Sequence, residues 1–160
     1  MSISPEMQIK LDRIESLIEN GYSLQKKWGY YPDLQNSSGK SINIFGPLFR
    51  LSGPAGFSWV AFFFPWVVCV QIKEWSYFYF VGILALATTA FNLAFDLNNS
   101  PIGLLIGFSY ANMFPYLRYM AAKQNVEEIS VGVSIVLGFV LSIVVLIPSV
   151  VLIFLRGSWL

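Results

Sequence analysis

The sequence predicts an all-α integral membrane protein with three full transmembrane helices and one re-entrant or interfacial helix, preceded by an amphipathic N-terminal helix. Hydrophobic residues make up 56% of the 160 positions and charged residues 12%, which is about half the charged share of a typical soluble domain. Four stretches lack charged residues, namely 51–72, 75–95, 97–117 and 129–155. Each can reach across a hydrocarbon core of roughly 30 Å at about 1.5 Å per helical residue. None shows the strict alternation of a barrel strand.

Residues 1–31 are expected to form a cytoplasmic amphipathic helical arm. Ser4 is a good N-cap, Pro5 suits the first helical position, and Gly21 is a natural stop. One face of this helix is apolar, with Met7, Leu11, Ile14, Leu17 and Ile18. This face either packs on the protein itself or lies on the bilayer; the alternative is that it docks a partner chain.

Residues 32–56 are rich in Pro, Gly, Ser and Asn and are expected to be a linker to a membrane domain at 57–160. Within that domain, 75–95, 101–117 and 129–155 are the predicted full crossings.

The segment 57–72 is ambiguous because Pro65 interrupts it, so it is predicted either to span the membrane or to be re-entrant or interfacial. Basic residues favour the second alternative. Six lie ahead of residue 51, and if 57–72 does not cross, Lys73, Arg118 and Lys123 join them on the cytoplasmic side and only Arg156 lies outside.

Small residues recur along two of the predicted spans and are candidate helix-packing or interaction sites. In the last span they are Ser130, Ser134, Gly138 and Ser142, one every four residues, and Gly103 and Gly107 form a second pair in the preceding span. Such residues allow helices to approach closely. The two faces are expected to pack on each other, with docking of another protein as the alternative.

The residues that commonly mark an enzyme are mostly missing. The chain has no His and a single Cys, Cys69, so we expect no metal site, no catalytic residue and no cofactor; cofactor-binding residues are unknown. The net charge of +1 gives no reason to expect a nucleic-acid partner.

Three polar residues near or within the spans are candidates for a polar path. Asp96 is an ionisable group beside a predicted crossing, and Asn92 and Asn112 lie deeper. The competing interpretation is that Asp96 belongs to an interfacial turn and that the two amides hydrogen-bond between helices.

The block FSWVAFFFPWVVCVQIKEW at 57–75 resembles a bacterial family of small membrane proteins, domain of unknown function 2628. The resemblance covers about residues 55–119 and rests on the Phe-x-Trp-x-Ala-Phe-Phe-Phe pattern, on the closing Lys73-x-Trp75, and on a later glycine-rich stretch with Gly107, Asn112 and Tyr116. Pro65 and Trp66 are slightly displaced from the family pattern, and the spacing from Asn112 to Tyr116 is one residue longer. The resemblance implies a membrane fold but no activity.

These features together predict a non-catalytic accessory, assembly or scaffold subunit of a larger membrane complex. Its partners would be the lipid bilayer and other membrane subunits, in a bacterial inner membrane with the N-terminus cytoplasmic. The alternative is a small channel or transporter component with a polar path near Asp96, Asn92 and Asn112. A membrane enzyme is a third hypothesis.

Overall fold

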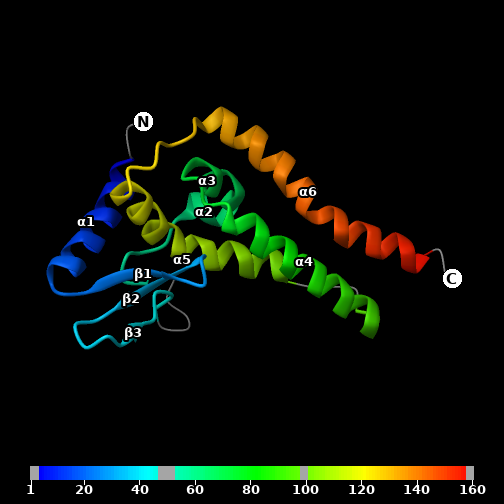
Figure 1. The fold of residues 1–160 in the computed structure, drawn as a ribbon, viewed down its shortest axis with the longest axis horizontal. Coiled ribbons are helices and arrows are strands. Elements are labelled where there is room, and N and C mark those ends of the chain that lie inside the picture. Colours follow the sequence, from blue (N-terminus) through cyan, green and yellow to red (C-terminus); the bar gives the residue numbers. More distant parts are fainter. Residues whose placement is uncertain (1–3, 47–52, 98–100, 158–160) are drawn as a thin grey trace.

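The computed structural model describes residues 4–46, 53–97 and 101–157, which are mostly helical. The described elements, in chain order, are α1 (Pro5–Glu19), β1 (Ser23–Lys27), β2 (Tyr31–Gln35), β3 (Ser41–Ile42), α2 (Trp59–Phe63), α3 (Pro65–Gln71), α4 (Ser76–Phe95), α5 (Ile102–Lys123) and α6 (Val131–Gly157). Figure 1 shows a head built from α1, the three strands, α2, α3 and the C-terminal half of α5. From this head, α4 and α6 project to one side.

Helix α1 has the predicted start and buries the predicted face. The Ser4 hydroxyl oxygen accepts a hydrogen bond from the Met7 amide at 3.3 Å, and Pro5 occupies the first helical position. Met7, Leu11 and Ile14 are buried in the head, where α1 packs on α5. Most of the apolar face of α1 therefore packs on the protein itself, and Leu17 and Ile18 at its end are half-buried.

A three-stranded antiparallel sheet occupies part of the region expected to be helical arm and linker, so the all-α prediction was wrong here. The turn after β1 places Trp28 and Gly29 at positive φ, and the Tyr30 amide donates to the Lys27 carbonyl at 3.2 Å. Such turns match the twist of paired strands. Leu34 of β2 and Ile44, just after β3, are fully buried and hold the sheet against the core of the head. Residues 47–52 of the expected linker lie outside the described residues.

The segment 57–72 forms two short helices, α2 and α3, instead of one. The chain bends at Phe64, and Pro65 begins α3, where its missing N–H costs no hydrogen bond. Neither the five residues of α2 nor the seven of α3 can cross a bilayer as a helix. The spanning alternative for this segment therefore does not match the structure.

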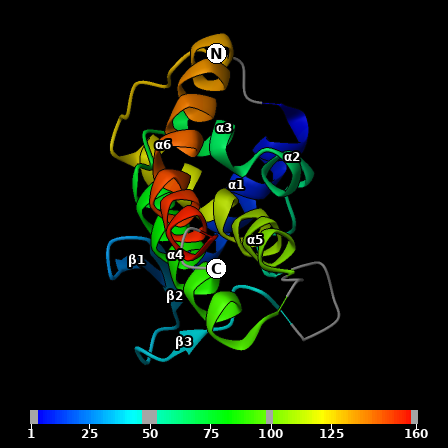
Figure 2. The same cartoon turned by 90° about the vertical axis from the view of Figure 1, so that its right-hand side faces the viewer.

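Two helices, α4 and α6, are long and apolar enough to cross a membrane. They run parallel, because Gly82 lies against Val145 while Arg156, near the end of α6, contacts Leu93 and Asp96 at the end of α4. The first half of α6 packs on α3, with Gly138 against Trp66. The view along the projecting helices in Figure 2 shows α6 and α4 on the same side of the molecule, with α5 beside them.

Helix α5 differs from the other two long helices because its C-terminal half belongs to the core of the head. Residues 110–117 are all buried, whereas Leu104, Leu105 and Phe108 near its start are exposed. At 22 residues this helix is long enough to cross a membrane, but it is less apolar than α4 and α6. The structure therefore contains two described helices that could cross a membrane, and the three full crossings predicted from the sequence are not confirmed.

Candidate functional site

Ser134, Gly138 and Ser142 lie on a line along which α6 packs on other described parts of the chain, whereas Ser130 precedes the helix. Ser134 and Gly138 are buried, Ser142 is half-buried and donates to the Gly138 carbonyl at 2.8 Å, and Ser130 is exposed at the start. A Cβ atom on Gly138 would lie 2.7 Å from Cε3 of Trp66 in α3. Gly138 is therefore an internal packing residue, consistent with the close approach that small residues allow.

The two glycines of α5, Gly103 and Gly107, do not contact the small residues of α6. A Cβ on Gly107 would lie 2.8 Å from the Phe62 carbonyl oxygen in α2, whereas a Cβ on Gly103 would contact nothing within 4 Å. The expectation that the two small-residue faces pack on each other is therefore not met, because Gly107 faces α2 and Gly138 faces α3.

The three residues of the suggested polar path lie in two separate places. Asn92 and Asp96 border a small cavity of about 290 Å³ near the end of α4. Asn112 is buried in the head, where its side-chain amide donates to the Phe108 carbonyl at 2.9 Å. Asn112 is two residues from Tyr110, whose ring contacts Tyr77 at the start of α4. At about 1.5 Å per residue, Asn92 is therefore about 20 Å further along α4.

Asp96 is an exposed helix-end carboxylate with a partner on α6. Its backbone is left-handed, with φ 52°, and ends α4. Nη2 of Arg156 donates to the carboxylate at 2.5 Å, and Nη1 donates to the Leu93 carbonyl. A cation at this position also interacts favourably with the negative end of the helix dipole. Sequence reasoning missed Arg156 as a partner because 60 residues separate the two.

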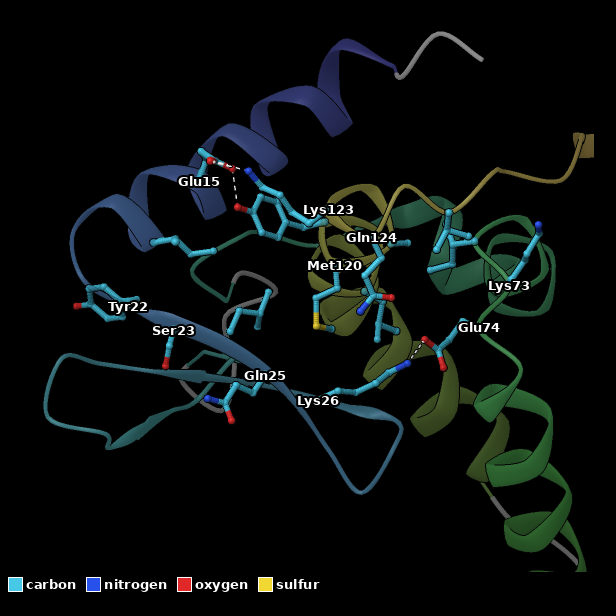
Figure 3. Close-up of a pocket in the computed structure, with 17 residues that line it drawn as sticks. Glu15, Tyr22, Ser23, Gln25, Lys26, Lys73, Glu74, Met120, Lys123 and Gln124 are labelled. Atoms are coloured by element: carbon cyan, nitrogen blue, oxygen red, sulfur yellow. Dashed lines mark hydrogen bonds and ion pairs between the residues drawn. The ribbon is translucent and has the colours of Figure 1, made fainter.

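A cleft of about 900 Å³ lies in the head. Its walls are α1, β1, the turn between α3 and α4, and the end of α5, and its apolar lining includes Ile18, Leu24, Ile72 and Met120. In Figure 3, Met120 and Gln124 lie between two charged groups of side chains. We name this the head cleft.

At one side of the head cleft, Glu15 joins α1 to α5. Its carboxylate accepts hydrogen bonds from the Tyr119 hydroxyl at 2.5 Å and from Nζ of Lys123 at 2.9 Å. These two hydrogen bonds, the one from Tyr119 first, lower the pKa of Glu15, and the bond to Glu15 raises the pKa of Lys123. Both groups therefore keep their charges near neutral pH, whereas a general acid or base works best with a pKa near the working pH.

At the other side, Glu74 joins the turn before α4 to strand β1. Its carboxylate accepts from Nζ of Lys26 at 2.5 Å and from the Ser76 hydroxyl. Figure 3 shows Lys26 and Glu74 pointing toward each other across the cleft, with Lys73 pointing away. The acidic groups of the head cleft are thus paired, and the cleft has an apolar floor between two neutralised pairs.

Comparison of the chain with protein-family models, with curated proteins and with solved structures finds no match. The resemblance to domain of unknown function 2628 stays a prediction.

The described residues contain no group of three or more His, Cys, Asp and Glu side chains that could hold a metal ion. Cys69 is buried in α3, as a small core residue would be. The head cleft, with its apolar floor, could bind an apolar group, and the exposed apolar faces of α4 and α6 could pack against lipid or other helices.

Proposed function

We propose that this protein is a non-catalytic accessory subunit of a larger membrane complex, anchored by α4 and α6 and carrying its head on the cytoplasmic side. The observation behind this proposal is the uncovered apolar surface of the two long helices. Along α6 only one line of side chains packs on the chain, and the remaining faces expose large apolar groups, including Val136, Phe139, Ile143 and Phe154. Surface of this kind and extent requires lipid or other apolar helices as its surroundings.

The direction of α4 and α6 supports three crossings. Because these helices are parallel, a chain that crosses outward along both must return between them. Helix α5 is the segment that runs back, and Leu104, Leu105 and Phe108 at its start are exposed apolar residues. We propose that α5 is the return crossing and that its buried second half ends inside the head.

The distribution of basic residues supports the proposed orientation of the head toward the cytoplasm. The basic residues of α1, of the sheet region, of the turn before α4 and of the end of α5 all lie at the head end, whereas Arg156 lies at the far end. Arg50 is outside the described residues. Cytoplasmic loops carry an excess of Lys and Arg, so we place the head in the cytoplasm. We extend the proposal to a bacterial inner membrane on the residue pattern at 57–75 alone.

The experiment is native mass spectrometry of the tagged full chain, extracted from its own cells in mild detergent. We expect a species heavier than the 18.0 kDa chain that contains a second, integral membrane protein in a reproducible ratio. A photo-crosslinking residue at Phe139 or at Phe154, both exposed on α6, then identifies which level of the helix touches that protein. The matched control carries the same residue at Leu141, on the packing line of α6.

Release of the chain alone, or only as copies of itself, with no protein adduct from either exposed position, would overturn the accessory-subunit proposal.

A further inference from the structure

A second cavity in the head, of about 400 Å³, lies between α1, α2, α3, α5 and the start of α6. Met7, Val68 and Phe114 give it apolar walls, and the charged side chains of Lys10, Arg118 and Glu6 also border it. We name this the cationic groove. It shares no lining residue with the head cleft.

The two cations of the groove are withdrawn from solvent. Only 9% of the Lys10 side chain and 15% of the Arg118 side chain are exposed. Charged side chains are rarely buried unless they are paired, because burial removes their hydration.

Their protein partners satisfy these cations only in part. Lys10 pairs with Glu6, which is 72% exposed, and Nη2 of Arg118 donates to Glu128 at 2.7 Å. Nε of Arg118 is buried and has no hydrogen-bond partner among the described residues. A guanidinium has five N–H donors, so Arg118 can bind a further anionic oxygen while it keeps Glu128.

The rim of the groove lies at the level where the membrane-spanning helices begin. Trp59 and Val60 of α2 form part of the rim and are exposed, as are Phe63 and Phe64 further along the segment. The Ser58 amide donates to the Ala111 carbonyl at 2.9 Å, next to Tyr110, whose ring contacts Tyr77 at the start of α4 with 4.8 Å between centroids.

This level suits the boundary between headgroups and acyl chains, where exposed tryptophan is enriched. Arg118 is seven residues beyond Ala111 on α5, about 10 Å further from the spans. A headgroup in the groove would thus lie in the aqueous layer while its acyl chains stay beside α2.

We propose that the cationic groove binds the phosphate of an anionic phospholipid, with Arg118 and Lys10 as the phosphate ligands and the apolar side chains of α2 beside the acyl chains. The inference rests on the proposed placement of α4 and α6 in the bilayer. It concerns a lipid ligand and is independent of the partner subunit.

The experiment uses the full chain reconstituted in phosphatidylcholine nanodiscs that contain a minor fraction of phosphatidylglycerol, with retained lipids counted by native mass spectrometry. We expect preferential retention of phosphatidylglycerol by the wild type. Arg118→Gln should reduce this retention about tenfold, because it removes charge-assisted hydrogen bonds. Lys10→Gln should reduce it in the same direction.

Two further variants separate binding from folding. Lys40→Gln removes the same charge from an exposed position ahead of β3 and should leave retention unchanged. Glu128→Gln removes the protein partner of Arg118 but keeps the cation, so it should retain at least as much phosphatidylglycerol as the wild type. If Arg118→Gln does not fold, the comparison of Lys10→Gln with Glu128→Gln still decides the matter, because only Lys10→Gln should lose retention.

Equal retention of the two lipids by the wild type would overturn the proposal. Displacement of phosphatidylglycerol by millimolar inorganic phosphate, with phosphate retained in its place, would show a free-phosphate site instead. Failure of the chain to enter the nanodiscs would contradict the membrane placement itself. The accessory-subunit proposal is tested separately, by the mass spectrometry and cross-linking of the chain taken from its own cells.

Discussion

At the scale of single residues, Gly138 and Gly103 show how the same residue type serves different purposes. Both belong to spacings typical of helix contacts, yet Gly138 touches Trp66 and Gly103 touches nothing within 4 Å of a built Cβ. The spacing of small residues predicts that a helix can be approached closely. It does not predict which neighbour makes the approach.

The contact at Gly138 predicts a loss of stability when a methyl group is added. Gly138→Ala places a Cβ 2.7 Å from Trp66 Cε3 and 3.1 Å from the Trp66 carbonyl oxygen. We expect unfolding in detergent to be easier by about 1–3 kcal/mol, the usual effect of overpacking. The control Gly103→Ala should be neutral or stabilising by up to about 1 kcal/mol, since alanine favours the helix. Thermal unfolding followed by circular dichroism measures both, and equal behaviour of the two variants would argue against the contact.

At the scale of elements, the ends of the helices are joined by charged groups from distant parts of the chain. Arg156 joins the ends of α4 and α6, and Glu15 joins α1 to α5. The start and the buried face of α1 could be predicted from the sequence, because an N-cap and an amphipathic pattern are local. The partners of Glu15 could not, since Tyr119 and Lys123 are more than 100 residues away.

The contact between α1 and α5 should depend on pH in a defined direction. Hydrogen bonds from Tyr119 and Lys123 lower the pKa of Glu15 below its ordinary value of 4.5. Its contribution to stability is therefore fully present above about pH 4.5 and is lost as the pH falls through the lower folded pKa. The pKa of Lys123 is raised above 10.5, so its contribution is present below that pH and is lost as the pH rises further.

Glu15→Gln tests this contact. We expect the variant to melt at a lower temperature than the wild type at pH 7, with a difference that shrinks as the pH falls below 4.5. Glu19→Gln, at the exposed end of the same helix, should change the melting temperature little at either pH. A difference that stays constant down to pH 3 would show that the carboxylate has no special role in holding α1.

At the scale of the whole molecule, α4 and α6 place the head and Asp96 at opposite ends. If both helices cross a membrane, the two ends face different compartments. The arrangement in Figure 1 makes this a geometric consequence of two parallel helices with one return segment.

Labelling with a membrane-impermeant maleimide in intact cells tests the orientation. Leu97→Cys, at the exposed far end of α4, should react in intact cells, whereas Ser38→Cys, on the exposed turn before β3, should react only after permeabilisation. The wild type is the control for background, because its Cys69 is buried. Equal reaction of both positions in intact cells would refute a crossing between them, and the reverse pattern would place the head outside.

Local sequence accounts for the long apolar segments that became α4 and α6, the start of α1 and the interruption at Pro65, because each depends on neighbouring residues. Contacts between distant parts of the chain account for the strand pairing within residues 23–42, for the burial of the second half of α5 inside the head, and for the separation of Asn112 from Asn92 and Asp96. Strand pairing in particular depends on the turn at Trp28 and Gly29 and on burial of Leu34 and Ile44, since Pro32 and Asp33 have low strand propensity. The four stretches share the absence of charged residues, and long-range packing makes α4 and α6 exposed and α5 half-buried.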